Sequence, residues 1–538
     1  MTSNTSQLSP GAAKVSAAKG PRTAPEEFSY LTVNPCKMCM PMGSITAAYG
    51  LRRAMNLLHG SQGCSTYIRR HMATHFNEPI DIASSSLTEQ GTVYGGEENL
   101  HAGINNLIRL YEPEVIVVST TCLAETIGED VPGMLARWQE KHPQSDVHLI
   151  PVTTPGYGGT QFEGYFRLLS AAVRSVKMDA TPHEGINVVT GPISPADMRW
   201  LLDVFERLGM DVCLLPDASE NLDGGFEDSY QRLPQHGTSL EQIRRMAGAR
   251  ATIELASFVP PEFSVASFLE QEHGVVAHRL PLPMGLGATD KFFAVLKELH
   301  GETTQPSPFR RFEKERARYL DALIDCHKYA AQCRVVIAGE PDFVLAATHM
   351  CTEVGIFPVV VATGSRCTEL RGLLTPEIET VADAHIAEFF TARDATTIGA
   401  NAGGGAGGNV SEALPGEVLP GDTLPGEAQE PSPSAAFAAS DPSVPFVILE
   451  DVDFNTIEGA AIRYGANVML ASSDARRVAH KLRIPLVRAA FPVHDHVGGQ
   501  RIRTLGYDGS LSLIDRMVNH IIEHTETSFR EDLREQYY

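Results

Sequence analysis

The sequence lacks the segments that would place the protein in a membrane or export it from the cell. No apolar run approaches the roughly 20 residues that span a bilayer, and residues 1–30 lack the apolar core of a signal peptide. Basic residues are in deficit, with 44 Lys and Arg against 66 Asp and Glu and a net charge of −22. Such a chain is repelled by nucleic acid and by anionic lipid. We therefore expect a cytoplasmic protein that binds neither a membrane nor nucleic acid.

Phosphate-binding loops and repeated cysteine pairs are also missing. There is no Walker A pattern, and the glycine-rich run 403–408, whose letters fit G-x-G-x-x-G, is low-complexity and follows no predicted strand, so it is not a phosphate-binding loop. If the reaction uses ATP, another protein binds the nucleotide. The nine cysteines are scattered and include a single C-x-x-C pair, Cys36 and Cys39, so a zinc ribbon is not indicated. In a reducing cytoplasm, where disulfides are rare, such cysteines are free thiols or metal ligands.

The length and the alternation of patterns predict an α/β fold. At roughly 100–200 residues per domain, 538 residues correspond to about three domains. Strand-like runs alternate with helical ones, which predicts three doubly wound αβα Rossmann-like domains with parallel sheets. The predicted divisions are a flexible arm (1–28), three domains (29–180, 181–332 and 333–538), and within the last a disordered insert rich in Gly, Pro and Ala (399–444).

Individual elements of the first predicted domain bear on the site. The spacing of apolar residues predicts a helix over 45–58, and short apolar runs predict strands at 115–118 and 147–152.

Three cysteines, Cys39, Cys64 and Cys122, lie in turn-like contexts rich in Gly, Ser, Thr or Pro. Cys122 follows the predicted strand 115–118 at its carboxyl end, where open α/β sheets bind ligands. Thiolates are the standard ligands of iron–sulfur clusters. Free cysteines are also commonly buried as small apolar residues, so composition alone decides for none of them. Three thiolates form an incomplete ligand set, which predicts that a second chain completes the site.

Three phrases of the sequence resemble the β-type subunit of nitrogenase component 1. They are N-P-C-K-M-C-M-P-M-G at 34–43, H-G-S-Q-G-C at 59–64 and T-T-C-L-A-E-T-I-G-E-D at 120–130. Weaker similarity occurs at 283–290, 339–343 and 491–509. The resemblance covers most of the chain apart from the arm and the insert, and it implies the nitrogenase component 1 fold.

The resemblance also implies a cofactor and partners. Cys39, Cys64 and Cys122 would supply one half of a P-cluster-type (8Fe–7S) iron–sulfur cluster. A homologous α-type subunit would supply the other half, within an α2β2 heterotetramer, and would hold the catalytic iron–sulfur cofactor. A homodimeric, ATP-dependent iron–sulfur reductase would dock and deliver electrons.

Two positions depart from the family pattern. Molybdenum nitrogenase has a cluster-linked serine in a T-P-S context, whereas this chain has Thr154-Pro155-Gly156. Serine ligation is therefore not available at Gly156. Cys36 has no counterpart in the usual pattern, and it is either a possible extra metal ligand or a thiol that only packs.

Other residues near the cysteines have two interpretations each. Glycines can let the backbone approach sulfide, and we list Gly43, Gly60 and Gly63. Hydroxyl groups either donate hydrogen bonds to sulfur or cap loops, and these are Ser65, Ser119, Thr120 and Thr121. Charged side chains either tune the site or form a solvated helix face, and these are Arg69, Arg70, His71, His75 and Glu89. For His494, Asp495 and His496, whose spacing does not share a helix face, the resemblance implies a structural role.

The resemblance leaves several functions to compare. The stretch 64–96 is most similar to nitrogenase-like proteins outside the dinitrogen-fixing set, including methylthio-alkane reductases, which release methanethiol and a hydrocarbon from small organic sulfur compounds. The predicted function is thus the electron-relaying β-type subunit of such a reductase. The alternatives are the β-subunit of a dinitrogen-fixing nitrogenase, a scaffold for cofactor assembly, whose smaller chain usually lacks the full cysteine set, and a dark-operative tetrapyrrole reductase, whose chains are generally shorter.

Overall fold

The computed structural model describes residues 35–226, 228–229, 231–233, 235–301, 307–382 and 445–537, with side chains as far as residue 527. The predicted arm and the predicted 399–444 insert lie outside the described residues. Among the helices that are described, none has both the length and the apolar character needed to cross a membrane.

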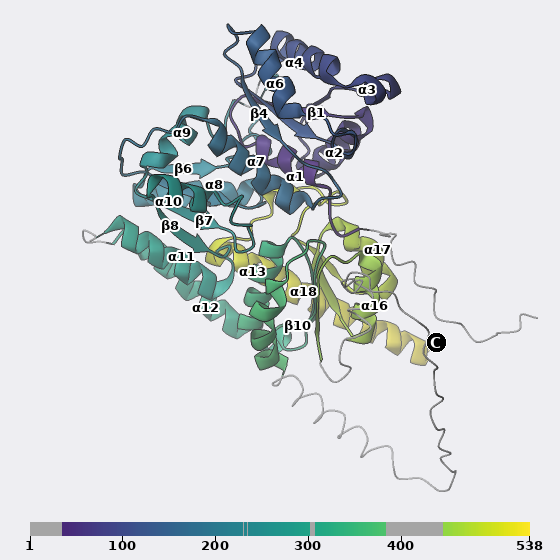
Figure 1. Cartoon of the computed structure of the whole chain (residues 1–538). Coiled ribbons are helices and arrows are strands. Elements are labelled where there is room, and N and C mark those ends of the chain that lie inside the picture. Colours follow the sequence, from purple (N-terminus) through teal and green to yellow (C-terminus); the bar gives the residue numbers. More distant parts are fainter. Residues whose placement is uncertain are drawn as a thin grey trace, which may run out of the picture. The chain divides into compact units, whose positions relative to one another are not determined.

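The N-terminal sheet has four parallel strands in the order β2-β1-β3-β4. Figure 1 labels β1 and β4 of this sheet. Its strands are β1 (Ala54–His59), β2 (Ile82–Ser84), β3 (Val115–Thr120) and β4 (His148–Val152). Alternate residues of a strand point to opposite faces of the sheet. In β3, Val115 and Val117 accordingly join one apolar cluster, whereas Ile116 and Val118 join another. The sheet is therefore buried on both faces.

Helices cover the two faces of this sheet. Residues of α4 (Glu97–Tyr111) and α6 (Val131–Lys141) pack in the cluster that contains Ile116. Residues of α1 (Met40–Ala48) and α7 (Gln161–Ser175) pack in the cluster that contains Val117. Parallel sheets need such double cover, because their strands are apolar on both sides.

Two further sheets are also parallel, with strand orders β6-β5-β7-β8 and β11-β10-β9-β12-β13. The strands of the first are β5 (Ile186–Thr190), β6 (Val212–Leu215), β7 (Ala251–Leu255) and β8 (Val276–Leu280). Those of the second are β9 (Arg334–Gly339), β10 (Phe357–Thr363), β11 (Val447–Leu449), β12 (Val468–Ala471) and β13 (Leu486–Arg488).

The remaining helices connect and flank these strands. They include α2 (Gln62–Phe76), α3 (Glu89–Tyr94), α5 (Cys122–Ile127), α8 (Pro195–Leu208), α9 (Leu240–Arg245), α10 (Val265–His273), α11 (Gly285–His300), α12 (Arg310–Ala330), α13 (Pro341–Glu353), α16 (Phe454–Arg463), α17 (Arg476–Leu482) and α18 (Gly506–Tyr537). The predicted α/β class with parallel sheets is confirmed. All three sheets belong to one compact unit, residues 32–538, so the domain boundaries at 180 and 332 stay predictions.

One predicted element of the first sheet is wrong. The helix expected over 45–58 ends at Ala48, and its second half is the strand β1. Arg53, with φ of 48°, separates the two elements. Every residue of β1 is buried, and periodicity alone cannot distinguish a short, fully buried strand from a buried helical segment.

A buried carboxylate connects the second sheet to the start of α18. Asp197 of α8 accepts hydrogen bonds from the backbone N–H groups of Thr504 and Leu505, at 2.8 and 2.9 Å. It also accepts bonds from the hydroxyls of Thr504, at 2.9 Å, and Ser194, at 3.0 Å. Only 1% of the Asp197 surface is exposed. The α18 helix therefore begins at a point that this side chain fixes.

We predict that Asp197→Ala lowers the free energy of unfolding by about 2–4 kcal/mol, because it leaves two buried N–H groups without acceptors. Asp203→Ala on the same helix is the matched control. Its ion pair with Arg207 is exposed to solvent and should contribute little to stability. Urea unfolding of the two variants measures the difference, and equal losses would show that Asp197 does not hold α18.

Candidate functional site

Two of the predicted cysteine ligands lie at the same edge of the N-terminal sheet. Cys64 lies in the first turn of α2, which follows β1, and Cys122 is the first residue of α5, which follows β3. These strands are parallel neighbours, with His59 paired with Thr120 at their carboxyl ends. Because the strands end level with each other, both thiols emerge at the ligand-binding edge of the sheet.

Cys39 reaches this edge through the packing of α1 on α7. A Cβ atom built on Gly43 would lie 1.7 Å from the Gln161 carbonyl oxygen, and one on Gly164 would lie 1.9 Å from that of Met40. Only glycine permits this close contact between the two helices. Cys39 immediately precedes α1 and forms a β-bridge with Thr160, which immediately precedes α7.

Gly156 lies between two of the thiols. Its backbone N–H donates a hydrogen bond of 3.1 Å to the Cys122 Sγ. A Cβ atom on Gly156 would lie 2.9 Å from that sulfur and 3.3 Å from the Cys39 Cβ. A serine side chain at this position would therefore displace Cys122. The sequence identified Gly156 only as a departure from the family pattern, and its contact with sulfur was missed.

The three thiols are close enough to interact electrostatically. Burial raises the pKa of Cys39, and the negative charges of Cys64 and Cys122 raise it further. Cys39 and Cys122 nevertheless have exposed surface, and Cys64 is half-buried. Neighbouring thiolates repel one another unless bound cations offset their charge. The arrangement is thus suited to several thiolates that share a positively charged group.

The arrangement does not suit a single metal ion. In the part of the chain that the structure describes, no group of three or more His, Cys, Asp and Glu side chains could hold a metal ion. An iron–sulfur cluster does not require the thiolates to converge on one point, because each thiolate binds a different iron atom of the cluster. The spread of Cys39, Cys64 and Cys122 over three loops fits a cluster.

Most of the nearby hydroxyls bond to protein groups. The Ser119 hydroxyl lies 2.8 Å from that of Ser44, Thr120 Oγ1 accepts from the Thr154 N–H at 2.8 Å, and Ser65 Oγ donates to the Gln62 carbonyl at 2.9 Å. Thr121 Oγ1 is buried, with no partner among the described residues. Of the four hydroxyl residues, Thr121 therefore best fits a donor to a bound group.

The glycines singled out in the sequence differ in what an added Cβ atom would meet. Gly43 meets the backbone of Gln161, a Cβ on Gly60 would lie 1.8 Å from Thr121 Oγ1, and one on Gly63 would meet only Ser61 Oγ, at 3.9 Å. These contacts are all with protein groups, and the approach of the three glycines to sulfide stays a prediction.

Cys36 is directed away from the other cysteines. Its Sγ donates a hydrogen bond of 2.7 Å to the Val452 carbonyl, and burial raises its pKa to about 12. The groups whose charges shift the pKa of Cys39 are Cys64 and Cys122, and Cys36 is not among them. These contacts favour the packing interpretation of Cys36.

The polar and charged residues noted beyond the cysteines have mostly structural contacts. His75 is 5% exposed, and its Nδ1 accepts from the Val493 N–H at 2.9 Å. Asp495 pairs with Arg488, while the His494 Nδ1 lies 3.8 Å from Asp474. Arg69 is mostly exposed and lies 3.9 Å from Asp81. The contacts of the 494–496 trio favour the structural role that the resemblance implies.

A buried histidine–glutamate pair beneath the site was missed in the sequence. His59 Nε2 lies 3.1 Å from a Glu129 oxygen, and the other oxygen of Glu129 accepts from the Gly96 N–H at 2.8 Å. Burial lowers the pKa of His59, while Glu129 opposes this shift. The pair connects the end of β1 to the loop after α5. His59 lies in the phrase 59–64 and Glu129 in the phrase 120–130. Their presence in these two phrases was the sequence signal that could have identified them.

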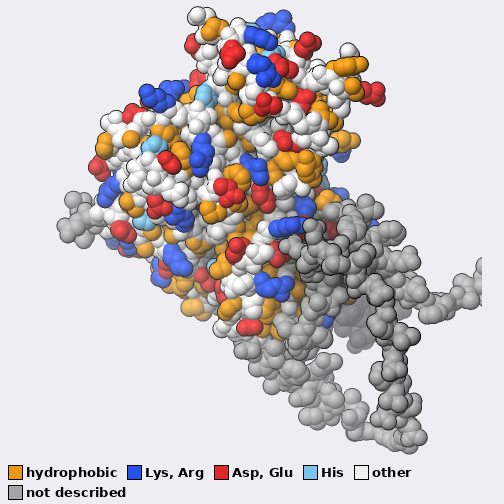
Figure 2. Space-filling view, viewed as in Figure 1, with side chains coloured by type: hydrophobic (Ala, Val, Ile, Leu, Met, Phe, Trp, Pro, Cys, Tyr) orange, Lys and Arg blue, Asp and Glu red, His pale blue; other side chains and the backbone are white. Residues whose placement is uncertain are grey.

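Apolar side chains are exposed on α2, which carries Cys64, on the following helix α3, and next to Gly156. Tyr67 of α2, Val93 and Tyr94 of α3, and Tyr157 each keep 65% or more of their surface exposed. On the face in Figure 2, acidic and basic side chains are interspersed, and neither sign forms a separate region. Exposed aromatic residues of this kind are typical of surfaces that another chain covers.

Comparison with known proteins decides the family. The model for nitrogenase component 1 type oxidoreductases matches residues 39–522. The chain belongs to the nitrogenase component 1 family. This component 1 chain is 28% identical over 508 residues to the nitrogenase molybdenum-iron protein beta chain of Clostridium pasteurianum, covering 94% of this chain and 96% of the relative. The beta chain of Frankia alni is 30% identical over 512 residues, covering 92% of this chain and 84% of the relative.

Structural comparison agrees with this assignment. The solved structure "Nitrogenase Cp1 at pH 6.5" matches with a TM-score of 0.76 and 27% identity, covering 93% of this chain and 95% of that chain. The predicted family and the predicted nitrogenase component 1 fold are therefore confirmed. The component 1 chain is a nitrogenase-like beta chain and a subunit of a nitrogenase-family oxidoreductase.

We predict that alkylation separates two classes of thiol in the iron-free chain. Iodoacetamide should modify Cys39 and Cys122, which are exposed, well before Cys333 and Cys351, which are fully buried. Peptide mass spectrometry over a time course measures the order, and unfolding in urea should remove the difference. Equal labelling rates in the folded chain would contradict the described exposure.

Proposed function

We propose that this chain is the electron-relaying β-type subunit of a nitrogenase-like reductase, and that Cys39, Cys64 and Cys122 bind one side of a P-cluster-type (8Fe–7S) iron–sulfur cluster. One observation carries the proposal: three thiols from separate segments of the chain meet at one sheet edge, where the charges of Cys64 and Cys122 raise the pKa of Cys39. Thiolates in this arrangement are suited to iron in a cluster.

The incomplete ligand set supports a shared site. The thiols of Cys39 and Cys122 remain exposed on this chain, beside the exposed Tyr67 and Tyr157. A homologous α-type subunit that covers them would supply the missing ligands and exclude water, within an α2β2 heterotetramer. The relatives named molybdenum-iron protein beta chain are consistent with such a partner. The partner would also hold the catalytic iron–sulfur cofactor, and a homodimeric ATP-dependent reductase would supply the electrons.

When bound, the cluster would supply one-electron transfer. The residues of this chain set the conditions for that transfer. The Gly156 N–H donates to the Cys122 sulfur and stabilises negative charge on it, and hydrogen bonds to sulfur and burial are what tune the potential of such groups. The His59–Glu129 pair holds two of the cysteine-bearing loops beneath the thiols.

We predict that Cys64→Ala removes the iron of the shared cluster and weakens the heterodimer. Cys36→Ala is the matched control and should retain the iron, because the Cys36 thiol bonds to the Val452 carbonyl. Iron quantification on the anaerobically purified complexes measures both. Unchanged iron content in Cys64→Ala would contradict the ligand assignment, and iron loss in Cys36→Ala would extend the ligand set to that residue.

For the substrate, we propose methylthio-alkanes. Two electrons and two protons convert the C–S bond of R–S–CH3 into R–H and methanethiol, so electrons relayed by this chain balance the reaction. The stretch 64–96 and Gly156 in place of serine support this choice. Dinitrogen reduction is the second candidate, because the relatives carry the name of the molybdenum-iron protein beta chain.

Product analysis distinguishes these candidates. With its partner, the reductase and ATP, the complex should release methanethiol from a methylthio-alkane and form little ammonia under dinitrogen. Gas chromatography and an ammonia assay measure both products. Ammonia as the main product would favour a nitrogenase, and a complex fully loaded with iron that turns over neither substrate would favour a scaffold for cofactor assembly.

A further inference from the structure

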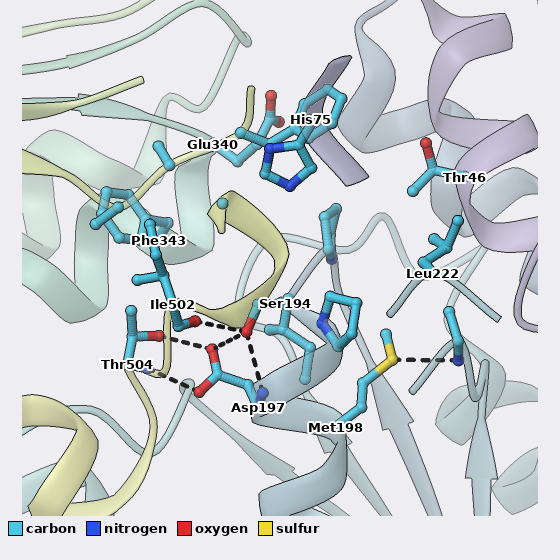
Figure 3. Close-up of a pocket in the computed structure, with 18 of the residues that line it drawn as sticks. Thr46, His75, Ser194, Asp197, Met198, Leu222, Glu340, Phe343, Ile502 and Thr504 are labelled. Atoms are coloured by element: carbon cyan, nitrogen blue, oxygen red, sulfur yellow. Dashed lines mark hydrogen bonds between the residues drawn. The ribbon is translucent and has the colours of Figure 1, made fainter. Parts of the chain in front are cut away.

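A cavity of about 90 Å³ lies among helices that flank different sheets. Figure 3 shows Thr46 of α1, His75 of α2 and Asp197 of α8 around it, with Glu340 and Phe343 from the start of α13. None of the three clustered cysteines lines it. Since one water needs about 10–15 Å³ by this measure, the cavity admits a guest of about six non-hydrogen atoms.

The walls of the cavity are mainly apolar. The side chains that form them include Phe76, Ile193, Met198, Leu222, Phe343 and Phe491. Water gains few hydrogen bonds in such a space, whereas a small apolar group gains dispersion contacts with the walls. The cavity is therefore better suited to an organic guest than to a cluster of waters.

One end of the cavity is polar and incompletely bonded. Glu340 Oε1 accepts from Gln161 Nε2 at 2.6 Å. Glu340 Oε2 and Gln161 Oε1 are buried and have no partner among the described residues, and Gln161 is only 6% exposed. Leaving two such oxygens unbonded is costly. Terminal amide and carboxyl torsions are soft, so a small rotation presents both oxygens to a guest.

The groups around the cavity are neutral or already compensated. No Lys or Arg lines it, and the Asp197 carboxylate is occupied by its four hydrogen bonds. Burial lowers the pKa of His75 to about 4 and raises that of Glu340 to about 8, so both are uncharged at neutral pH. A charged guest would lose its hydration without a compensating partner.

We propose that this cavity binds one small neutral molecule, with an apolar body against Phe343 and Met198 and one hydroxyl-like group bonded to Glu340 and Gln161. The protonated carboxyl of Glu340 donates to the guest, and the Gln161 carbonyl oxygen accepts from it. This inference does not rest on the proposed reductase function, because it uses only contacts within this chain.

The first test uses 1-butanol, which falls within the size limit, against the purified complex. Saturation-transfer NMR should detect saturable binding of 1-butanol, and neither n-butylammonium nor butyrate should bind at the same concentrations. Absence of saturable 1-butanol binding would overturn the proposal. Tighter binding of n-butylammonium would also overturn it, because it would show that Glu340 is an anionic anchor.

Variants locate the binding in this chain. Thr46→Phe should fill the cavity and abolish the saturable signal. Thr46→Val is the matched control, since it keeps the volume and removes only the Thr46 Oγ1 bond to the Met42 carbonyl. Ile193→Trp fills the cavity from another wall, in case Thr46→Phe does not fold. Unchanged 1-butanol binding in a folded filling variant would place the guest elsewhere and overturn the proposal.

The polar anchor has its own test. Glu340→Leu should weaken 1-butanol binding about three- to tenfold, the effect of losing one hydrogen bond. Binding of xenon, which has no polar group, should stay the same in this variant. Equal loss for both probes would show that the substitution only damages the walls and would overturn the role of Glu340.

Discussion

The geometry of the candidate site depends on the parallel pairing of β1 and β3, which end at the same level in the sheet. β1 and β3 are paired along their full length, so Cys64 and Cys122 emerge side by side from the loops that follow them. Cys39 joins them because Gly43 and Gly164 let α1 and α7 meet backbone to backbone. A shift in the β1–β3 pairing or in the α1–α7 contact would move the thiols apart. The position of the three cysteines therefore depends on both contacts.

The same chain contains two polar environments of opposite character. At the sheet edge, Cys39, Cys64 and Cys122 lie near one another and are partly or fully exposed, and their thiolate forms repel one another unless positive charge is bound beside them. In the cavity near Glu340, burial keeps His75 and Glu340 neutral, and hydrogen bonds compensate the Asp197 carboxylate, an arrangement suited to an uncharged guest. The difference follows from solvent access, because water can solvate exposed thiols, whereas burial disfavours the charged form of a carboxyl.

Much of this architecture could be predicted from the sequence. Short apolar runs were enough to predict single strands, and short sequence phrases were enough to predict the family. The strands at 115–118 and 147–152 correspond to β3 and β4, and the family was correct. The buried strand β1 was mistaken for a helix, since six buried residues carry no distinctive period. The Gly156–Cys122 contact and the His59–Glu129 pair join residues 34 and 70 positions apart, so they depend on tertiary packing that no local pattern reports.

We infer that Cys39, Cys64 and Cys122 bind iron at an interface with a second, homologous chain. The most direct measurement is a structure of the anaerobically purified complex with anomalous scattering recorded at the iron edge. The account predicts iron atoms within bonding distance of all three sulfurs, and ligands from the partner on the opposite side. Three free thiols facing solvent or protein, with no iron between the chains, would contradict it.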